Sequence, residues 1–248
     1  MPAKIRLDQY LVELGHYATR SRARDAILRG SVRVNGKLAR KPAAAVSPDI
    51  EIAISDAAHS YVSRAALKLK QGLDATGYAP AGRLALDIGA STGGFTQVLL
   101  EAGAAHVCAI DAGHGQMDPK LAADSRVTSM EGINAREIDA GLFGGAQFTF
   151  LVADVSFISL KLALPPALGL AATGAVGIFL IKPQFEVGRE HVGKSGLVRE
   201  KATAEKSAQE LAGWFDQQPG WRLTHFLPSP IKGGDGNREW LMAGKKNR

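Results

Sequence analysis

The sequence predicts an α/β fold with a mainly parallel sheet and an antiparallel C-terminal strand, preceded by a small α+β module. From residue 84 onward, short apolar runs alternate with helical stretches, the pattern of parallel strands joined by crossover helices. The first 41 residues form a dense basic block. The 248 residues suffice for one full α/β domain and a small module. We expect domains at residues 1–54 and 61–248, joined by a linker at 55–60.

The N-terminal module is predicted to contain two short helices and a hairpin. Residues 6–14 carry leucines at helical spacing before a glycine, which indicates an amphipathic helix. Thr19 is placed to cap a second helix that ends at the next glycine. Residues 31–38 hold alternating valines and an Asn35-Gly36 turn, the strongest short hairpin signal.

The positive charge of the chain is concentrated in this module. Residues 1–41 hold ten lysines and arginines against three acids, a balance of +7. The whole chain carries +6, so the rest carries the difference between +6 and +7, which is −1. A basic block beside a near-neutral domain is the electrostatic footprint of a protein that binds a polyanion. The alternative is a solvated basic surface that serves only solubility.

Composition excludes several other classes of protein. No apolar stretch approaches the roughly 20 residues of a membrane helix, and the N-terminus has no apolar signal core, so we expect a cytoplasmic protein without a membrane partner. Cys108 is the single cysteine, which excludes an internal disulfide and suggests a small core residue. The six histidines show no ligand spacing, so we expect no metal.

The second domain is organised around residues 84–96, predicted to be a buried strand, a glycine turn and the start of a helix. Gly89, Gly93 and Gly94 permit a tight turn and close approach of backbone N–H groups to a ligand. The spacing matches neither a dinucleotide fingerprint nor a triphosphate loop. Asp111 ends the second strand, where an acid can accept hydrogen bonds from ribose hydroxyls. This combination suits S-adenosylmethionine better than NAD or ATP; the alternative is a turn that only connects strand to helix.

Polar residues stand at the ends of five successive predicted strands. Because right-handed crossovers bring the carboxyl ends of parallel strands to one edge, these side chains should gather where open α/β sheets bind ligands. A single polar strand end could simply cap the next helix. The five are Asp87, Asp111, Glu131, Asp154 and Lys182.

Three further segments flank this edge. Residues 61–73 predict a helix whose apolar stripe leaves Lys68 pointing away from the core. Residues 188–199 are glycine-rich and basic, typical of a mobile loop that could cover a substrate. The stretches 223–227 and 239–243 predict an antiparallel pair that finishes the sheet and returns Glu239 to the same edge.

Three N-terminal motifs resemble the S4 RNA-binding module. They are Arg-Leu-Asp-Gln-Tyr-Leu at residues 6–11, Thr-Arg-Ser-Arg-Ala at 19–23 and Gly-Ser-Val-Arg-Val-Asn-Gly-Lys at 30–37. The resemblance implies that the basic helix face and the hairpin hold structured RNA by phosphate and shape contacts. The residues it assigns to RNA are Arg6, Arg20, Arg22, Arg24, Arg29, Arg33 and Lys37.

Nearly the whole chain resembles the TlyA (hemolysin A) family, whose catalytic domain is similar to FtsJ-type ribose 2′-O-methyltransferases. Four motifs match the Lys-Asp-Lys-Glu tetrad of such enzymes: Ser-Arg-Ala-Ala-Leu-Lys at residues 63–68, Ala-Asp-Val-Ser-Phe at 153–157, Ile-Lys-Pro-Gln-Phe-Glu at 181–186 and Asn-Arg-Glu-Trp at 237–240. The stretch Asp-Ala-Ala-His-Ser at 56–60 departs from the tryptophan-containing linker that family members often have.

The resemblance implies a Rossmann-like class I methyltransferase that uses S-adenosylmethionine to methylate the ribose 2′-hydroxyl of ribosomal RNA at cytidines, with ribosomal RNA or subunits as partner. The implied catalytic residues are Lys68, Asp154, Lys182 and Glu239. The implied cofactor residues are Asp87, Gly89, Ala90, Ser91, Thr92, Gly93, Gly94, Phe95, Asp111, Glu131 and Asn134.

This chemistry needs alignment and removal of one proton, and it needs no metal. We assign Lys182 as the base, with Asp154 and Glu239 orienting the lysines and the ribose. A neighbouring Lys68 cation and partial burial would help Lys182 to lose its proton, whereas the two carboxylates would oppose that loss. Alternatively, Lys182 stays charged and only positions the oxygen.

Three other functions compete with this hypothesis. An RNA-binding or ribosome-assembly protein could keep a silent methyltransferase fold. A pore-forming haemolysin, suggested by the older family name, would need a spanning or long amphipathic helix that the sequence does not predict. Pseudouridine synthases also carry S4 modules, but they would leave the glycine turn unexplained.

Overall fold

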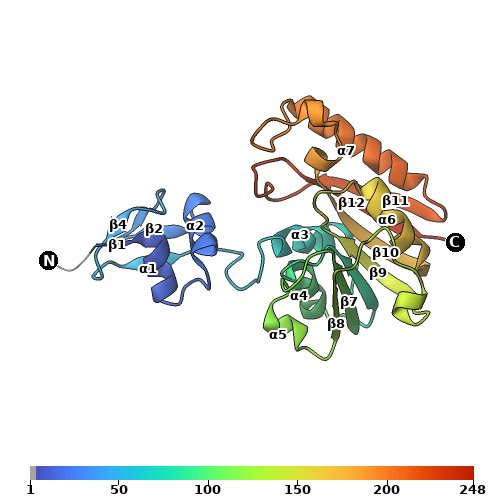
Figure 1. Ribbon diagram of the computed structural model, residues 1–248, viewed down its shortest axis with the longest axis horizontal. Helices are drawn as coiled ribbons and strands as arrows, with labels where there is room; N and C mark the ends of the chain where they lie inside the picture. The colour runs from blue at the N-terminus through green and yellow to red at the C-terminus, as the bar shows by residue number, and fades with distance from the viewer. Residues whose placement is uncertain (1–3) are drawn as a thin grey trace. The chain divides into compact units, whose positions relative to one another are not determined.

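The computed structural model describes residues 4–248 and divides into two compact units, which meet in sequence between Ser60 and Tyr61 (Figure 1). Each unit has its own apolar core, so each is described by itself.

The first unit packs two short helices against small antiparallel sheets. Strand β1 pairs with β4, and β2 pairs with both β3 and β5. Leu7, Leu11 and Ile27 are fully buried between these elements. The elements are β1 (Ile5–Arg6), α1 (Leu7–Glu13), α2 (Arg20–Leu28), β2 (Val32–Val34), β3 (Lys37–Leu38), β4 (Ala45–Val46) and β5 (Ile52–Ile54).

Local signals explain these boundaries. The Thr19 side chain caps α2 by accepting a hydrogen bond from the Arg22 backbone N–H. Asn35 and Gly36 have φ values of 48° and 74°, the left-handed conformations that a two-residue hairpin turn requires. The predicted helices and hairpin are therefore present within one or two residues of the expected positions.

Residues 55–60, expected as a linker, are held against the first unit. The Asp56 carboxylate accepts hydrogen bonds from the Tyr17 hydroxyl at 3.1 Å and from Arg29 at 2.9 Å. Ala58 is buried, and the His59 ring lies edge-on to Tyr17 with Nε2 2.7 Å from the His16 carbonyl. These side-chain contacts carry no periodic pattern, which is why the sequence alone gave no sign of them.

The second unit contains a seven-stranded sheet in the order β11-β12-β10-β9-β6-β7-β8. Neighbouring strands from β10 through β8 are parallel, whereas β12 is antiparallel to both β10 and β11. The strands are β6 (Leu84–Ile88), β7 (His106–Asp111), β8 (Val127–Glu131), β9 (Phe148–Ala153), β10 (Ala171–Ile181), β11 (Trp221–Pro228) and β12 (Trp240–Lys246). The predicted mainly parallel sheet with an antiparallel C-terminal strand is confirmed.

Helices cover both faces of this sheet. One buried cluster contains the apolar sides of α6 and α7, and the other contains those of α3 and α4 (Figure 1). The helices are α3 (Ala66–Thr76), α4 (Gly94–Glu101), α5 (Pro119–Ala122), α6 (Leu160–Gly169) and α7 (Lys201–Asp216), with 3₁₀ turns η1 (Gly141–Phe143), η2 (Pro183–Phe185) and η3 (Arg189–His191). Among the described residues, no helix is long and apolar enough to cross a membrane.

The largest local difference from the sequence prediction is in α3. The helix begins at Ala66, so residues 61–65 are not helical. Lys68, predicted to point away from the core, is buried with 5% of its surface exposed. Lys68 lies outside the apolar stripe of α3 that packs against the sheet. Another part of the same unit covers that side of the helix, where Lys68 pairs with the Glu239 carboxylate.

Candidate active site

The glycine turn between β6 and α4 forms one wall of the site. Gly89, Ser91 and Gly93 have φ values of 80°, 47° and 94°, all in the left-handed region. A Cβ at Gly89 would lie 2.9 Å from the Asp154 carbonyl oxygen, so only glycine allows the two strand ends to approach so closely. The strand–turn–helix prediction is confirmed in the structure.

The backbone N–H groups in the first part of this turn do not face a ligand, contrary to expectation. Those of Gly89 and Ala90 donate to the Ile110 carbonyl at 2.9 and 3.1 Å, and that of Ser91 donates to Asp111 Oδ2 at 2.8 Å. Because these donors are satisfied by the end of β7, the turn contributes shape to the site rather than a set of free donors.

A cavity of about 140 Å³ opens beside the turn. Its walls combine the glycine turn with the ends of β9 and β10, so the two strand ends and the start of α4 share one pocket. The lining residues are Ser63, Ala65, Gly89, Ala90, Ser91, Thr92, Gly94, Phe95, Asp154, Ser156 and Lys182. Six of the expected cofactor residues and two of the expected catalytic residues therefore line the same cavity.

Lys182 and Asp154 form an ion pair at the wall of this cavity. Lys182 Nζ lies 2.6 Å from Asp154 Oδ1 and donates a hydrogen bond to Ser156 Oγ at 2.9 Å. Pro183 follows Lys182, whose φ of −114° and ψ of 95° keep the chain extended where β10 ends. The side chains retain 12% and 14% of their exposure, so a ligand in the cavity can reach both.

Lys68 and Glu239 form a second pair that is almost closed to solvent. Lys68 Nζ lies 2.6 Å from Glu239 Oε2, and the two side chains are 6% and 2% exposed. Burial raises the pKa of Glu239, and the Lys68 ammonium acts in the opposite direction. Asp154 and Lys182 also affect the Glu239 carboxylate electrostatically, which indicates that the two ion pairs are neighbours.

Asp87 is held behind the cavity. Its side chain is completely buried, and Oδ2 accepts a hydrogen bond of 2.7 Å from the Thr96 hydroxyl. Burial raises the pKa of Asp87 to about 7. Asp87 therefore ties β6 to α4 instead of presenting a carboxylate to the cavity.

The three other polar residues assigned to the cofactor hold backbone segments in place. Asp111 accepts hydrogen bonds from the Ser91 and Gly113 N–H groups. Glu131 accepts from the N–H groups of residues 115, 116 and 117, which lowers its pKa. Asn134 bonds to Glu137 and Arg136 in its own turn.

Gly93 packs against Met117 and Leu121, so residues 112–118 form a loop across the rim of the turn.

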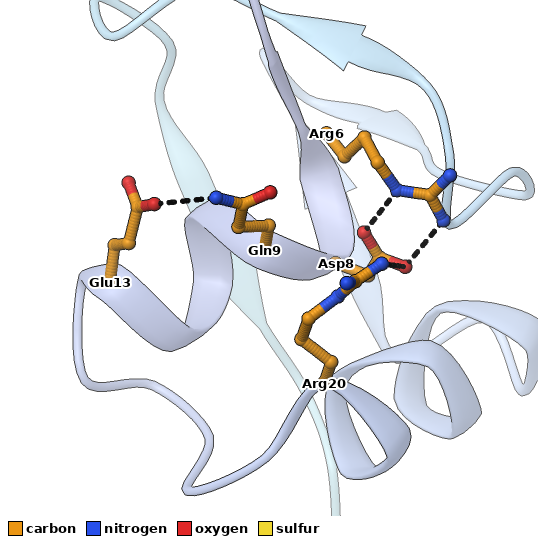
Figure 2. A network of polar contacts seen from close by, with 5 residues as sticks. All are labelled: Arg6, Asp8, Gln9, Glu13 and Arg20. Carbon is orange, nitrogen blue, oxygen red and sulfur yellow. Dashed lines mark hydrogen bonds and ion pairs between the residues drawn. The ribbon is translucent and has the colours of Figure 1, made fainter.

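The first unit carries a separate pocket of about 240 Å³ that is lined by arginines. Figure 2 shows its centre, where Asp8 lies between two guanidinium groups: Arg6 Nη2 at 2.8 Å and Arg20 Nη2 at 3.5 Å. Arg24 and Ser21 complete the lining. The Asp8 side chain is 4% exposed, and the Arg6 guanidinium holds its pKa below the usual range.

The other basic residues assigned to RNA lie outside this pocket. Arg22 contacts the Ala58 carbonyl and Arg29 pairs with Asp56, so both approach residues 55–60. Arg33 donates to the Gly36 carbonyl in the hairpin, and Lys37 is exposed.

Sequence reasoning missed Phe157, the most exposed large apolar side chain of the site. The ring is 91% exposed, and its backbone φ of 65° is unusual for a bulky residue. Phe157 follows the cavity residue Ser156 and lies 5.2 Å from the Phe185 ring, between centroids. The signal in the sequence was an aromatic residue just after a polar strand end, where no core position is expected.

Sequence reasoning also missed Asp8, Ser156 and Asn237. Each is a short polar side chain whose role depends on contacts with segments distant in sequence or on a neighbouring strand end. Among the described residues, no group of three or more histidine, cysteine or acidic side chains could hold a metal ion.

Comparisons with known proteins agree with this geometry. Residues 61–246 match the family model of FtsJ-like methyltransferases, and residues 5–52 match that of the S4 domain. The chain is 42% identical over 243 residues to the 16S/23S rRNA (cytidine-2′-O)-methyltransferase TlyA of Mycobacterium tuberculosis, covering 98% of this chain and 90% of the relative. It is 38% identical to Hemolysin A of Brachyspira hyodysenteriae, covering 96% and 98%.

A solved structure is also similar. A protein from Streptococcus thermophilus that carries the name of a hemolysin superposes with a TM-score of 0.77 at 37% identity, covering 99% of this chain and 90% of the other. The S4 and FtsJ-like matches, the relatives and the paired lysines beside a glycine turn lead to one conclusion: the chain belongs to the TlyA family of FtsJ-like methyltransferases.

Proposed function

We propose that the protein uses S-adenosylmethionine to methylate the ribose 2′-hydroxyl of ribosomal RNA, with cytidine as the target nucleoside. The observation that carries this proposal is the Lys182–Asp154 pair, which lines the same cavity as the glycine turn. The relative from M. tuberculosis, named as a cytidine-2′-O-methyltransferase of 16S and 23S rRNA, supports the choice of substrate. A chain acting on ribosomal RNA would work in the cytoplasm, where ribosomes are.

The residues present fit the cofactor. Small ligand pockets generally occupy roughly 300–1,000 Å³, so the enclosed cavity of about 140 Å³ accommodates only part of such a ligand. Gly89 and Ala90 give this part a wall without bulky side chains, and no lysine is placed for a triphosphate on the turn. We assign the enclosed part to the sulfonium end, and the Asp111 side of the turn to the adenosine end.

The cofactor supplies a methyl group that its sulfonium already activates for transfer to a nucleophile. The protein must therefore place a ribose 2′-oxygen in line with that methyl and accept the hydroxyl proton. Lys182 Nζ is the basic atom exposed to the cavity, and we assign it as the proton acceptor in its neutral form. Asp154 Oδ1 and Ser156 Oγ, at 2.6 and 2.9 Å, orient Nζ toward the cavity.

The Lys68–Glu239 pair acts through its charge and its position. Lys68 neutralises the Glu239 carboxylate within the closed part of the site, which leaves Asp154 as the acid that orients Lys182. Holding reactants in a near-attack geometry supplies about 7–11 kcal/mol, whereas a general base supplies roughly 10²- to 10⁴-fold in rate. Positioning by the cavity should therefore contribute more to the rate than proton transfer.

Two other features would hold the RNA. The arginine pocket around Asp8 presents guanidinium groups in a fixed arrangement that suits a phosphate. Phe157 offers an exposed aromatic face beside the cavity, on which an unstacked base can lie while its ribose enters. An enzyme that acts on a nucleotide within structured RNA must take that nucleotide out of its stack.

The test is transfer of labelled methyl from S-adenosylmethionine to ribosomal subunits and to stripped ribosomal RNA, followed by nucleoside analysis. We expect 2′-O-methylcytidine with the wild-type protein and a large loss with Lys182→Ala. If neither substrate is labelled and cofactor binding is also absent, the protein is an RNA-binding protein with a silent fold. Label on a base instead of a ribose would contradict the assignment of the reaction.

A further inference from the structure

A buried amide joins two loops beside the active site. Asn237 is 4% exposed, and its Oδ1 accepts a hydrogen bond from the Val198 N–H at 2.9 Å. Its Nδ2 donates to the Gly196 carbonyl at 2.8 Å. The Asn237 backbone carbonyl accepts from the Gly233 N–H. The side chain therefore binds the backbone of residues 188–199, and the main chain closes the turn of residues 229–238.

The loop of residues 188–199 also has hydrogen bonds within itself. Val192 and Val198 form an antiparallel bridge, and Arg199 N–H donates to the His191 carbonyl at 2.9 Å. Gly193 N–H donates to the Leu197 carbonyl at 2.8 Å. In the structure, the glycine-rich segment that the sequence predicted to be a loop is hairpin-like, and its tip carries Lys194.

Both loops are tied to residues of the proposed active site. Residues 188–199 begin six positions after Lys182, and Asn237 lies two positions before Glu239. The two loops lie together near the ends of the strands in Figure 1. A ligand bound to these loops would therefore lie next to the active-site side chains, including Lys182 and Glu239.

The charge on the two loops is strongly positive. Together they hold five lysines and arginines against two acids, Glu190 and Asp235. Glu190 lies 3.7 Å from the His191 ring, and Asp235 faces Gly196. The five basic residues, all exposed, are Arg189, Lys194, Arg199, Lys232 and Arg238. Such a surface fits a polyanion.

We propose that residues 188–199 and 229–238 form a second RNA-contacting surface, which holds the ribose-phosphate backbone next to the target nucleotide, with Asn237 as its positioning residue. The proposal rests on the function proposed above. It assigns phosphate contacts to the methyltransferase unit itself, in addition to those of the S4 unit. Asn237 does not touch the RNA, but it fixes the loop that does.

Charge reversal provides the direct test. Lys194→Glu and Arg199→Glu are made singly in the full-length protein. Lys206→Glu on α7 is the matched control, because Lys206 is exposed and its carboxylate partner is Glu210 on the same helix. Binding to stripped ribosomal RNA is measured over a salt series. Each loop variant should weaken binding severalfold and flatten the slope of log K against log salt by about 0.7–0.9, the contribution of one phosphate contact.

Binding of S-adenosylmethionine should be the same in all three variants, because none of these side chains lines the cavity. Loop variants that bind RNA with the wild-type affinity and salt slope would overturn the proposal. So would an equal loss in Lys206→Glu, since that would indicate a general effect of charge.

Asn237→Ala tests the positioning role. Loss of both hydrogen bonds to the loop should raise KM for RNA about tenfold and change kcat at saturating RNA much less, whereas Asn237→Asp keeps the acceptor for Val198 N–H and should recover part of the loss. A fall in kcat with unchanged KM would overturn the role. If Asn237→Ala does not fold, the Lys194→Glu and Arg199→Glu variants still test whether these loops contact RNA.

Methylation and RNA-binding assays of the wild-type protein distinguish failure of the second RNA surface from failure of the proposed function. If it methylates RNA and the loop variants bind RNA normally, only the second surface fails. If it neither binds nor methylates RNA, the proposed function fails, and this surface with it.

Discussion

The two lysine–carboxylate pairs of the candidate active site have the same N–O distance, 2.6 Å, but different surroundings. Lys68 and Glu239 are 6% and 2% exposed, whereas Lys182 and Asp154 are 12% and 14% exposed and line the cavity. The closed pair cannot reach a substrate without opening. The comparison teaches that equal N–O distances can occur in different surroundings: one pair is closed to solvent, and the other lines the cavity.

A third acid shows what happens without a cation. Asp87 is as buried as Glu239, but its neighbour is the Thr96 hydroxyl, and burial raises its pKa to about 7. The unit therefore contains an open pair, a closed pair and an unpaired acid within one sheet edge. Each substitution below changes the open pair, the closed pair, the unpaired acid, or Asp8 of the first unit.

Substitution of Lys182 in the open pair should have the largest effect, which we expect on the methylation rate. Lys182→Ala removes the proposed proton acceptor and should lower the single-turnover rate by 10²- to 10⁴-fold, the usual contribution of a general base. Lys182→Arg keeps a cation that does not lose its proton, so we expect it to be as slow as Lys182→Ala. The rates are measured with labelled cofactor. Substantial activity in Lys182→Arg would show that Lys182 only positions the oxygen.

The closed pair should be more important for stability. Lys68→Met leaves the Glu239 carboxylate buried without its partner and should cost about 3–5 kcal/mol in the free energy of unfolding, measured with urea. The double variant Lys68→Met with Glu239→Leu removes both charges and should recover most of that stability. A single variant as stable as the wild type would mean that the pair contributes little to the fold.

The raised pKa of the unpaired acid, Asp87, predicts that the free energy of unfolding depends on pH. An unfolded aspartate titrates near 3.9 and folded Asp87 near 7, so the folded state binds more protons between these values. Protonated Asp87 therefore favours the folded state at low pH. As pH rises through this window, the free energy of unfolding falls by up to about 4 kcal/mol. Asp87→Asn should remove this part of the dependence.

Urea unfolding of both proteins between pH 4 and 8 measures the difference in their free energies. The advantage of the wild type over Asp87→Asn should shrink as pH rises, while the contribution of Glu239, whose pKa is also raised, cancels between them. A difference that stays constant with pH would show that folding does not raise the pKa of Asp87.

Asp8 should give the smallest effect. Asp8→Asn weakens the bonds that orient Arg6 and Arg20, and fixing a long side chain on binding costs about 0.5–1.5 kcal/mol. RNA affinity should fall about threefold to tenfold. The matched control is Glu13→Gln, on the same helix, whose partner is Gln9 (Figure 2). Equal affinities in the two variants would exclude a positioning role for Asp8.

Sequence reasoning worked where structure depends on neighbours along the chain. Thr19 before a helix, Asn35-Gly36 between short strands and glycines after Ile88 each specify local backbone geometry. The alternation of apolar runs with helical stretches likewise predicted the strands and their mainly parallel arrangement, because a buried strand must be apolar whatever lies beyond it.

The same reasoning failed where a side chain depends on a distant segment. The helical pattern predicted only that Lys68 points away from the core. Its partner Glu239 lies 171 positions further along the chain, so no periodicity in α3 indicates the pair. Phe157 was missed because its exposure follows from one left-handed backbone residue.

The sequence by itself determined the elements, the sheet class and the types of polar residue at the strand ends, because propensity and periodicity act over a few residues. Only the tertiary structure decided which lysine meets which carboxylate, which pair is closed, and which acid remains without a cation. The physical reason is that burial and Coulomb interactions depend on distance in space, and the pairing of charges is set only when the strands and helices have packed.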